Sequence, residues 1–87
     1  LDMSDNQLGG VPTTGLHKLR NLRKLYLNRN RIGSLSPNSF TNFQSKDILL
    51  KLELAGNRLT DQALGDGTVL RPLKSLQELS LETNALT

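Results

Sequence analysis

Four asparagines recur at nearly constant spacing and carry the clearest chemistry in this chain of 87 residues. They are separated by 24, 27 and 27 positions, at Asn6, Asn30, Asn57 and Asn84. A primary amide offers two N–H donors and one carbonyl acceptor, so it can satisfy backbone groups that a turn leaves unpaired. We therefore expect these side chains to form a structural ladder of buried hydrogen bonds between neighbouring repeats, with no role in ligand binding.

Residues that could carry reaction chemistry are few. The chain has one histidine, His17, and no cysteine, and its serines and carboxylates show no spacing typical of a nucleophile, a base and an orienting group. Residues 65–68, GDGT, superficially resemble a phosphate-binding loop, but they lack the spacing of a P-loop. The scattered carboxylates and the single histidine also make a poor metal site. The sequence predicts no enzyme, no metal site and no cofactor.

Each asparagine lies within the same short pattern, Leu-x-Leu-x-x-Asn-x-Leu, at residues 1–8, 25–32, 52–59 and 79–86, with Met3 and Ile32 as variants. A fixed period of this length is typical of stacked repeats, each too small to bury its own apolar face. Because side chains alternate along a strand, both leucines of Leu-x-Leu point to one side. The pattern predicts one parallel strand per repeat, with a return segment whose apolar residues complete the core: Leu8, Val11, Leu16, Leu19, Ile32, Leu35, Phe40, Phe43, Leu59, Leu64, Leu70, Leu73 and Leu76.

The second copy extends to a longer pattern, LRKLYLNRNRIGSLSPNSFTNF at residues 22–43, which resembles the leucine-rich repeat almost position for position. The resemblance covers the whole chain. It implies the α/β class: a right-handed βα solenoid with a parallel concave sheet and short or irregular convex segments. We expect one array over residues 1–87, with repeats at 1–21, 22–48, 49–75 and 76–87. Neither end has a polar capping unit, so we expect an internal piece of a longer solenoid.

The subtype has two interpretations. The tail of the second copy resembles the extracellular subgroup, which includes Toll-like receptors, Slit-type guidance proteins, matrix proteoglycans and chaoptin-like adhesion proteins. The third copy, NRLTDQAL at residues 57–64, is more similar to ribonuclease-inhibitor-type repeats, which are cytosolic. The favoured hypothesis is a non-enzymatic recognition module of an extracellular or cell-surface receptor, adhesion or matrix protein. The alternative is an intracellular, cytoplasmic scaffold. No apolar run approaches the roughly 18 residues of a membrane span.

The outward positions of the predicted strands form the first candidate binding site. Tyr26 is the only aromatic residue expected on this exposed sheet, and basic residues flank it. Such a composition is typical of a protein-binding hot spot. The predicted partner-binding residues of the concave face are Lys24, Tyr26, Asn28, Arg29, Arg31, Lys51, Glu53, Arg58, Glu78 and Glu82. We also expect the pairs Asp5–Arg29 and Lys51–Glu78 to form between strands.

A basic cluster forms the second candidate site. Between Asn6 and Lys46 there is no acidic residue and there are seven basic ones, in a chain of net charge +3. Arginine suits bidentate contacts with sulfate or phosphate. The candidate residues for a polyanion such as a glycosaminoglycan are Lys18, Arg20, Arg23 and Lys24. No recognised nucleic-acid motif is present, so nucleic acid is not an expected partner.

Overall fold

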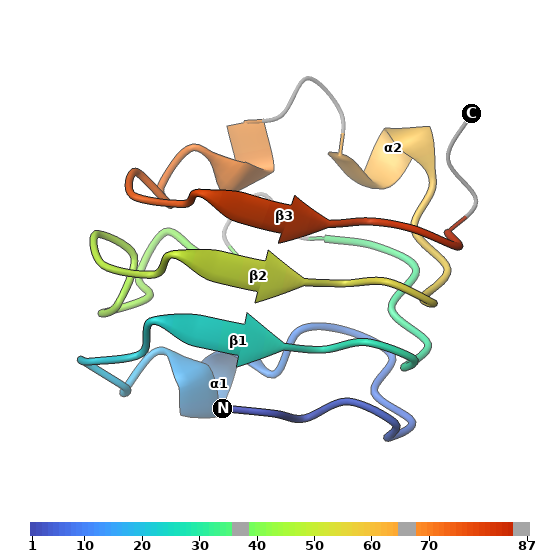
Figure 1. Ribbon diagram of the computed structural model, residues 1–87, viewed down its shortest axis with the longest axis horizontal. Helices are drawn as coiled ribbons and strands as arrows, with labels where there is room; N and C mark the ends of the chain where they lie inside the picture. The colour runs from blue at the N-terminus through green and yellow to red at the C-terminus, as the bar shows by residue number, and fades with distance from the viewer. Residues whose placement is uncertain (36–38, 65–67, 85–87) are drawn as a thin grey trace.

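The computed structural model describes residues 1–35, 39–64 and 68–84, and its centre is a parallel sheet of three strands. The strands are β1 (Lys24–Tyr26), β2 (Lys51–Glu53) and β3 (Glu78–Ser80), in the order β1-β2-β3 (Figure 1). Equivalent residues of successive repeats are paired, so the 27-residue offset of the sequence pattern is also the register of the sheet. The first segment of the chain runs alongside β1 and pairs through a single parallel bridge between Asp2 and Tyr26.

The strands return over the other side of the molecule through turns and short helical segments. These are α1 (Thr13–Leu16), α2 (Asp61–Leu64) and the 3-10 helix η1 (Thr68–Leu70). The return segment of the second repeat contains only turns and irregular structure among its described residues. The prediction of short or irregular convex segments is therefore confirmed. None of the helices among the described residues has the length and apolar character needed to cross a membrane.

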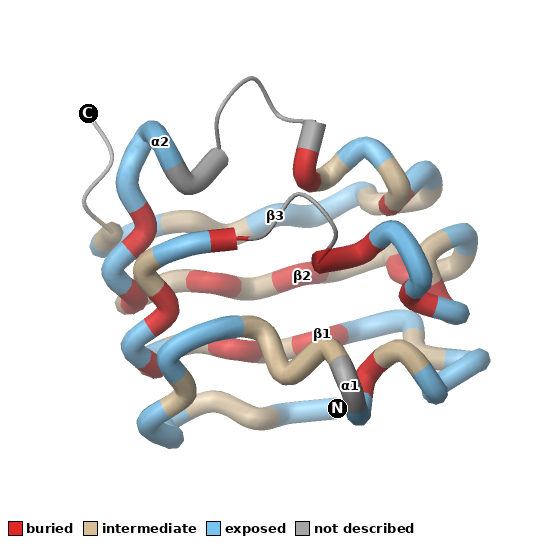
Figure 2. The backbone as a smooth tube through the Cα atoms, turned by 180° about the vertical axis from the view of Figure 1, so that it is seen from behind, coloured by how far each residue is buried: buried red, intermediate tan, exposed pale blue. Residues whose placement is uncertain are grey.

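The core lies between the sheet and the return segments, where Figure 2 shows the buried positions of successive repeats in rows. The leucines of the central strands are fully buried, and Phe40 and Phe43 pack against each other with ring centroids 6.0 Å apart. The predicted core residues that are buried are Leu16, Ile32, Leu35, Phe40, Phe43, Leu59 and Leu73, whereas Leu8, Val11, Leu70 and Leu76 are half-buried at its border. The side chain of Leu64 lies outside the described part of the structure.

The prediction that Leu19 belongs to the core is wrong. This side chain remains 39% exposed, because it lies at the outer face of the first repeat, where no described residue packs over it. Leu79 of β3 is equally exposed at the opposite end of the sheet, for the same reason. Its equivalents Leu25 and Leu52 have a repeat on either side and are fully buried. Burial in this fold therefore depends on the neighbouring repeats as much as on the residue type.

Candidate functional site

Each strand ends in a turn that requires an unusual backbone conformation at one repeated position. The residue before each ladder asparagine has a positive φ: 60° at Asp5, 54° at Arg29, 70° at Gly56 and 56° at Thr83. This left-handed region is easily adopted by glycine and costs energy for other residues, most for β-branched ones. The turn directs the following asparagine side chain inward, beneath the sheet.

The asparagine side chains then connect one repeat to the next. Nδ2 of Asn57 donates to the carbonyl oxygens of Leu54 at 2.9 Å and of Leu27, in the preceding repeat, also at 2.9 Å. Its Oδ1 accepts the backbone N–H of Ile32 at 3.1 Å. The amide is therefore fully occupied by backbone groups, which leaves no free group for a ligand.

The same bonds recur at two other ladder positions. Oδ1 of Asn30 accepts the N–H of Leu8 at 3.2 Å, and its Nδ2 donates to carbonyls of both its own and the preceding repeat. Asn84 accepts the N–H of Leu59 at 2.9 Å and donates in the same two directions. Asn6 is exposed, and among the described residues its side chain bonds only to carbonyls of its own turn. The ladder thus spans the four turns, with its buried part in the central two.

On the concave face, the side chain of Lys51 connects three neighbours. Its Nζ lies 3.2 Å from a carboxylate oxygen of Glu53 and 3.2 Å from one of Glu78 on the next strand. The same ammonium lies 5.8 Å from the centre of the Tyr26 ring, within the range of a cation–π contact. The two carboxylates, Glu53 first, raise the pKa of Lys51 above its usual value. The structure therefore brings together four of the predicted partner-binding residues into one connected group.

Asn28 extends this group but is itself largely occupied. Its Nδ2 donates to Glu53 at 2.7 Å, and its Oδ1 accepts the backbone N–H of Ala55 at 2.9 Å. The hydrogen bond from Asn28 and, after it, the one from Lys51 lower the pKa of Glu53, against the opposing effect of burial. In turn, the backbone N–H of Asn28 donates to the hydroxyl of Ser4 at 3.0 Å. These bonds between repeats fix the orientation of the sheet surface.

The remaining predicted residues lie around this group. Arg29 forms a bidentate, exposed ion pair with Asp5, whose carboxylate oxygens lie 2.5 Å from Nε and 2.9 Å from Nη2. The hydrogen bond from Arg29 lowers the pKa of Asp5, and the pKa of Arg29 is correspondingly raised. Four more predicted residues are exposed and form no ion pair among the described residues: Lys24, Arg31, Arg58 and Glu82.

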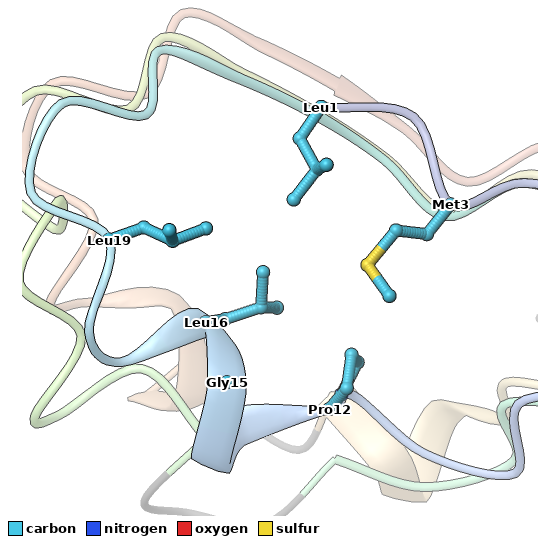
Figure 3. A pocket seen from close by; sticks show the side chains of 6 residues that line it. All are labelled: Leu1, Met3, Pro12, Gly15, Leu16 and Leu19. Carbon is cyan, nitrogen blue, oxygen red and sulfur yellow. The ribbon is translucent and has the colours of Figure 1, made fainter.

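A pocket of about 220 Å³ opens at the outer face of the first repeat (Figure 3). Its lining is entirely apolar, formed by Leu1, Met3, Pro12, Gly15, Leu16 and Leu19. A specific small-molecule site needs a few polar groups to orient its ligand, and this pocket offers none. It is therefore a poor candidate for a substrate or cofactor site.

A comparison of the sequence with known protein families agrees with this geometry of repeated strands, left-handed turns and asparagine side-chain hydrogen bonds. The model of the family described as leucine rich repeat matches residues 1–59. The chain belongs to the leucine-rich repeat family. The predicted leucine-rich-repeat solenoid is thereby confirmed. Two curated relatives are keratocan from Mus musculus and keratocan from Bos taurus, each 34% identical over 86 residues. The match covers 99% of this chain and 22% of each keratocan, so the chain spans about a fifth of their length.

Leucine-rich-repeat membership and the similarity to keratocan both point to a non-enzymatic protein-interaction module. Among the described residues, no three histidines, cysteines or carboxylates gather in a group that could hold a metal ion. Residues 65–67 of the GDGT loop lie outside the described part of the chain. The basic candidates Lys18, Arg20, Arg23 and Lys24 are all exposed on the segment that leads into β1.

Proposed function

We propose that this chain is a recognition module of an extracellular protein and that it binds a protein partner through its concave face, around Tyr26. The observation that carries the proposal is the group formed by Tyr26, Lys51, Glu53 and Glu78. A half-buried aromatic ring lies beside an ammonium that two carboxylates hold in place. Tyrosine is one of the residue types that dominate the energetics of protein interfaces.

The order within this group supports its role in binding. Association loses conformational freedom of interface side chains, at about 0.5–1.5 kcal/mol for each flexible one that becomes ordered. Lys51 is already held by two carboxylates, and Glu53 by Asn28 and Lys51. The surface therefore presents an aromatic ring within a charged frame that is already ordered before a partner arrives.

Similarity to keratocan, a secreted protein of the extracellular matrix, supports an extracellular location for this chain. It favours the extracellular interpretation of the repeats over an intracellular ribonuclease-inhibitor-type scaffold. Attachment to a cell surface, signalling and adhesion are more specific hypotheses within this proposal.

Substitution at the centre of the face tests the proposal. Tyr26→Ala is expected to weaken binding of a protein partner by more than ~1 kcal/mol, since truncation of an interface anchor typically costs that much. Thr41→Ala, at an exposed position of the return segment, is the matched control. Equal affinities of the wild type and Tyr26→Ala would reject the concave face as the binding surface.

A further inference from the structure

Three segments that lie far apart in the sequence form one edge of the solenoid. They lead into β1, β2 and β3 and are stacked one above another in Figure 1. Buried Ser45 fastens the second segment to the first, with its Oγ donating to the carbonyl of Leu19 at 2.6 Å. Ser75 fastens the third to the second by donating to the carbonyl of Asp47 at 2.6 Å. We call this surface the basic edge, and it comprises residues 17–24, 44–51 and 71–78.

The charge of the chain is concentrated on this edge. Eight of the eleven lysines and arginines lie there, but only two of the eight carboxylates, Asp47 and Glu78. The basic edge therefore has a net charge of +6, and the rest of the chain −3. The sequence-based cluster at residues 18–24 is the first third of a surface that continues across two more repeats.

Internal ion pairs neutralise only part of this charge. Asp47 lies 3.9 Å from Lys46, and Glu78 lies 3.2 Å from Lys51, so both carboxylates already have a cation. The six other cations of the edge are exposed and form no ion pair among the described residues: Lys18, Arg20, Arg23, Lys24, Arg71 and Lys74. A surface lined by one sign of charge raises the local concentration of ions of the opposite sign and attracts polyanions.

We propose that the basic edge binds a linear sulfated polysaccharide that runs across the repeats, at right angles to the strands. Neighbouring strands lie about 4.8 Å apart, so the six unpaired cations, which lie on the first and third segments, are separated along the stack by about two strand spacings. A polymer with sulfates at intervals along its length matches this arrangement. Arginine also binds the oxygens of a sulfate group in a bidentate manner, which its planar guanidinium favours.

The aromatic residues argue against a single-stranded nucleic acid as the occupant. Proteins that hold single strands stack bases on exposed aromatic side chains. Phe40 and Phe43 are buried, and Tyr26 lies on the concave face. His17, the aromatic residue of the edge, is half-buried, and its Nε2 lies 3.1 Å from the carbonyl oxygen of Ser39. The choice of a sulfated polymer also rests on the extracellular location proposed above, whereas the binding surface itself is separate from the one around Tyr26.

The experiment measures binding of the full-length protein to immobilised heparin. The double variants Arg20→Gln/Arg23→Gln and Arg71→Gln/Lys74→Gln remove the same charge from the first and the third segment. Each is expected to weaken binding about fivefold to tenfold and to reduce its salt dependence, because exposed ionic contacts are individually weak and involve released counterions. The matched control, Arg31→Gln/Arg58→Gln, removes two exposed cations outside the edge and should leave the affinity within twofold of wild type.

The other arms separate the possible outcomes. Fully desulfated heparin and single-stranded DNA of equal length should bind at least tenfold more weakly than heparin, the first because it lacks the sulfates and the second because the edge offers its bases no exposed aromatic side chain. Equal binding of DNA would overturn the assignment to a sulfated polysaccharide. An unchanged heparin affinity of the Arg71→Gln/Lys74→Gln variant would overturn the proposal that the binding surface extends across the repeats to the third segment. The Tyr26→Ala variant should bind heparin like the wild type. Heparin binding therefore tests the basic edge independently of the proposed protein-binding surface around Tyr26. Thermal unfolding of each variant verifies that it is folded.

Discussion

Nδ2 of Asn57 donates a 2.9 Å hydrogen bond to the carbonyl oxygen of Leu27, which lies 30 positions earlier in the chain. Asn84 makes the equivalent 2.9 Å bond to Leu54, again 30 positions earlier. Each of these carbonyls also accepts a hydrogen bond from the asparagine of its own repeat, Asn30 at Leu27 and Asn57 at Leu54, so consecutive asparagines share one acceptor. The stability of one repeat is thereby coupled to the presence of the next, as expected of a solenoid.

Asn57→Ala is expected to lower the free energy of unfolding by about 1–3 kcal/mol, because the buried N–H of Ile32 would lose its acceptor. The carbonyls of Leu27 and Leu54 would each lose one of two asparagine donors, and would keep those of Asn30 and Asn84 respectively. Urea denaturation followed by circular dichroism measures the change. Asn6→Ala is the control and should cost clearly less, since Asn6 is exposed. An unchanged urea midpoint for Asn57→Ala would refute the structural role.

Gly56→Ala is expected to destabilise the protein by about 1 kcal/mol or more, since a residue with a Cβ pays that penalty in the left-handed region. Gly56 has a φ of 70°, and an added Cβ would lie 3.1 Å from Cγ of Arg29. Gly9→Ala is the matched control, because an added Cβ there meets no atom within 4 Å. Thermal melts of the two variants make the comparison. Equal melting temperatures would contradict the strained turn.

Ser45→Ala is expected to cost about 1 kcal/mol, because two part-buried backbone groups would lose the hydroxyl of a buried side chain as their hydrogen-bond partner. The Ser45 hydroxyl donates to the carbonyl of Leu19 and accepts the N–H of Leu22 at 2.9 Å. Ser34→Ala removes an exposed hydroxyl and should be nearly neutral. Both changes are measured by chemical denaturation. A Ser45→Ala variant as stable as Ser34→Ala would show that this link between the segments contributes nothing.

The ion pair of Asp5 with Arg29 predicts a pH effect of definite sign. Because the folded pKa of Asp5 is lowered, its contribution to stability is present above the ordinary pKa of an aspartate. That contribution is lost as the pH falls through the folded value. In Arg29→Ala, the pKa of Asp5 should rise towards its ordinary value, as measured by carboxyl-carbon NMR titration. Asp2 is an internal reference, since its pKa is lowered mainly by Ser4 and should move much less. No movement at Asp5 would contradict the pair.

The sequence was sufficient for the features that depend on spacing alone. The offset between Leu25, Leu52 and Leu79 predicts the paired positions of the three strands, and the sheet has that register. Because Lys51 and Glu78 occupy equivalent positions, their approach across the strands followed from the same offset. These features were predictable because every repeat solves the same packing problem with the same residue types.

Features that depend on the return segments were not predictable from the pattern. Ser45 lies outside the repeated motif, so its burial and its two hydrogen bonds had no signal in the sequence. Leu19 was expected in the core because the sequence pattern is the same in repeats that have a neighbour packed against them and in repeats that do not. The basic edge was recognised only at residues 18–24, although an alignment of the three segments that lead into the strands would also have placed Arg71 and Lys74 beside them.

Site-specific photocrosslinking would show whether a protein partner occupies the concave face around Tyr26. A photoreactive phenylalanine analogue replaces Tyr26 or, as the control, Thr41 on the return segment. Both proteins are illuminated in an extracellular extract of the source tissue, with and without an excess of unlabelled wild type. We expect a discrete protein adduct from position 26 that the wild type competes away, and none from position 41. An adduct from position 41 alone, or the same adducts from both positions, would show that the partner does not bind at the concave face.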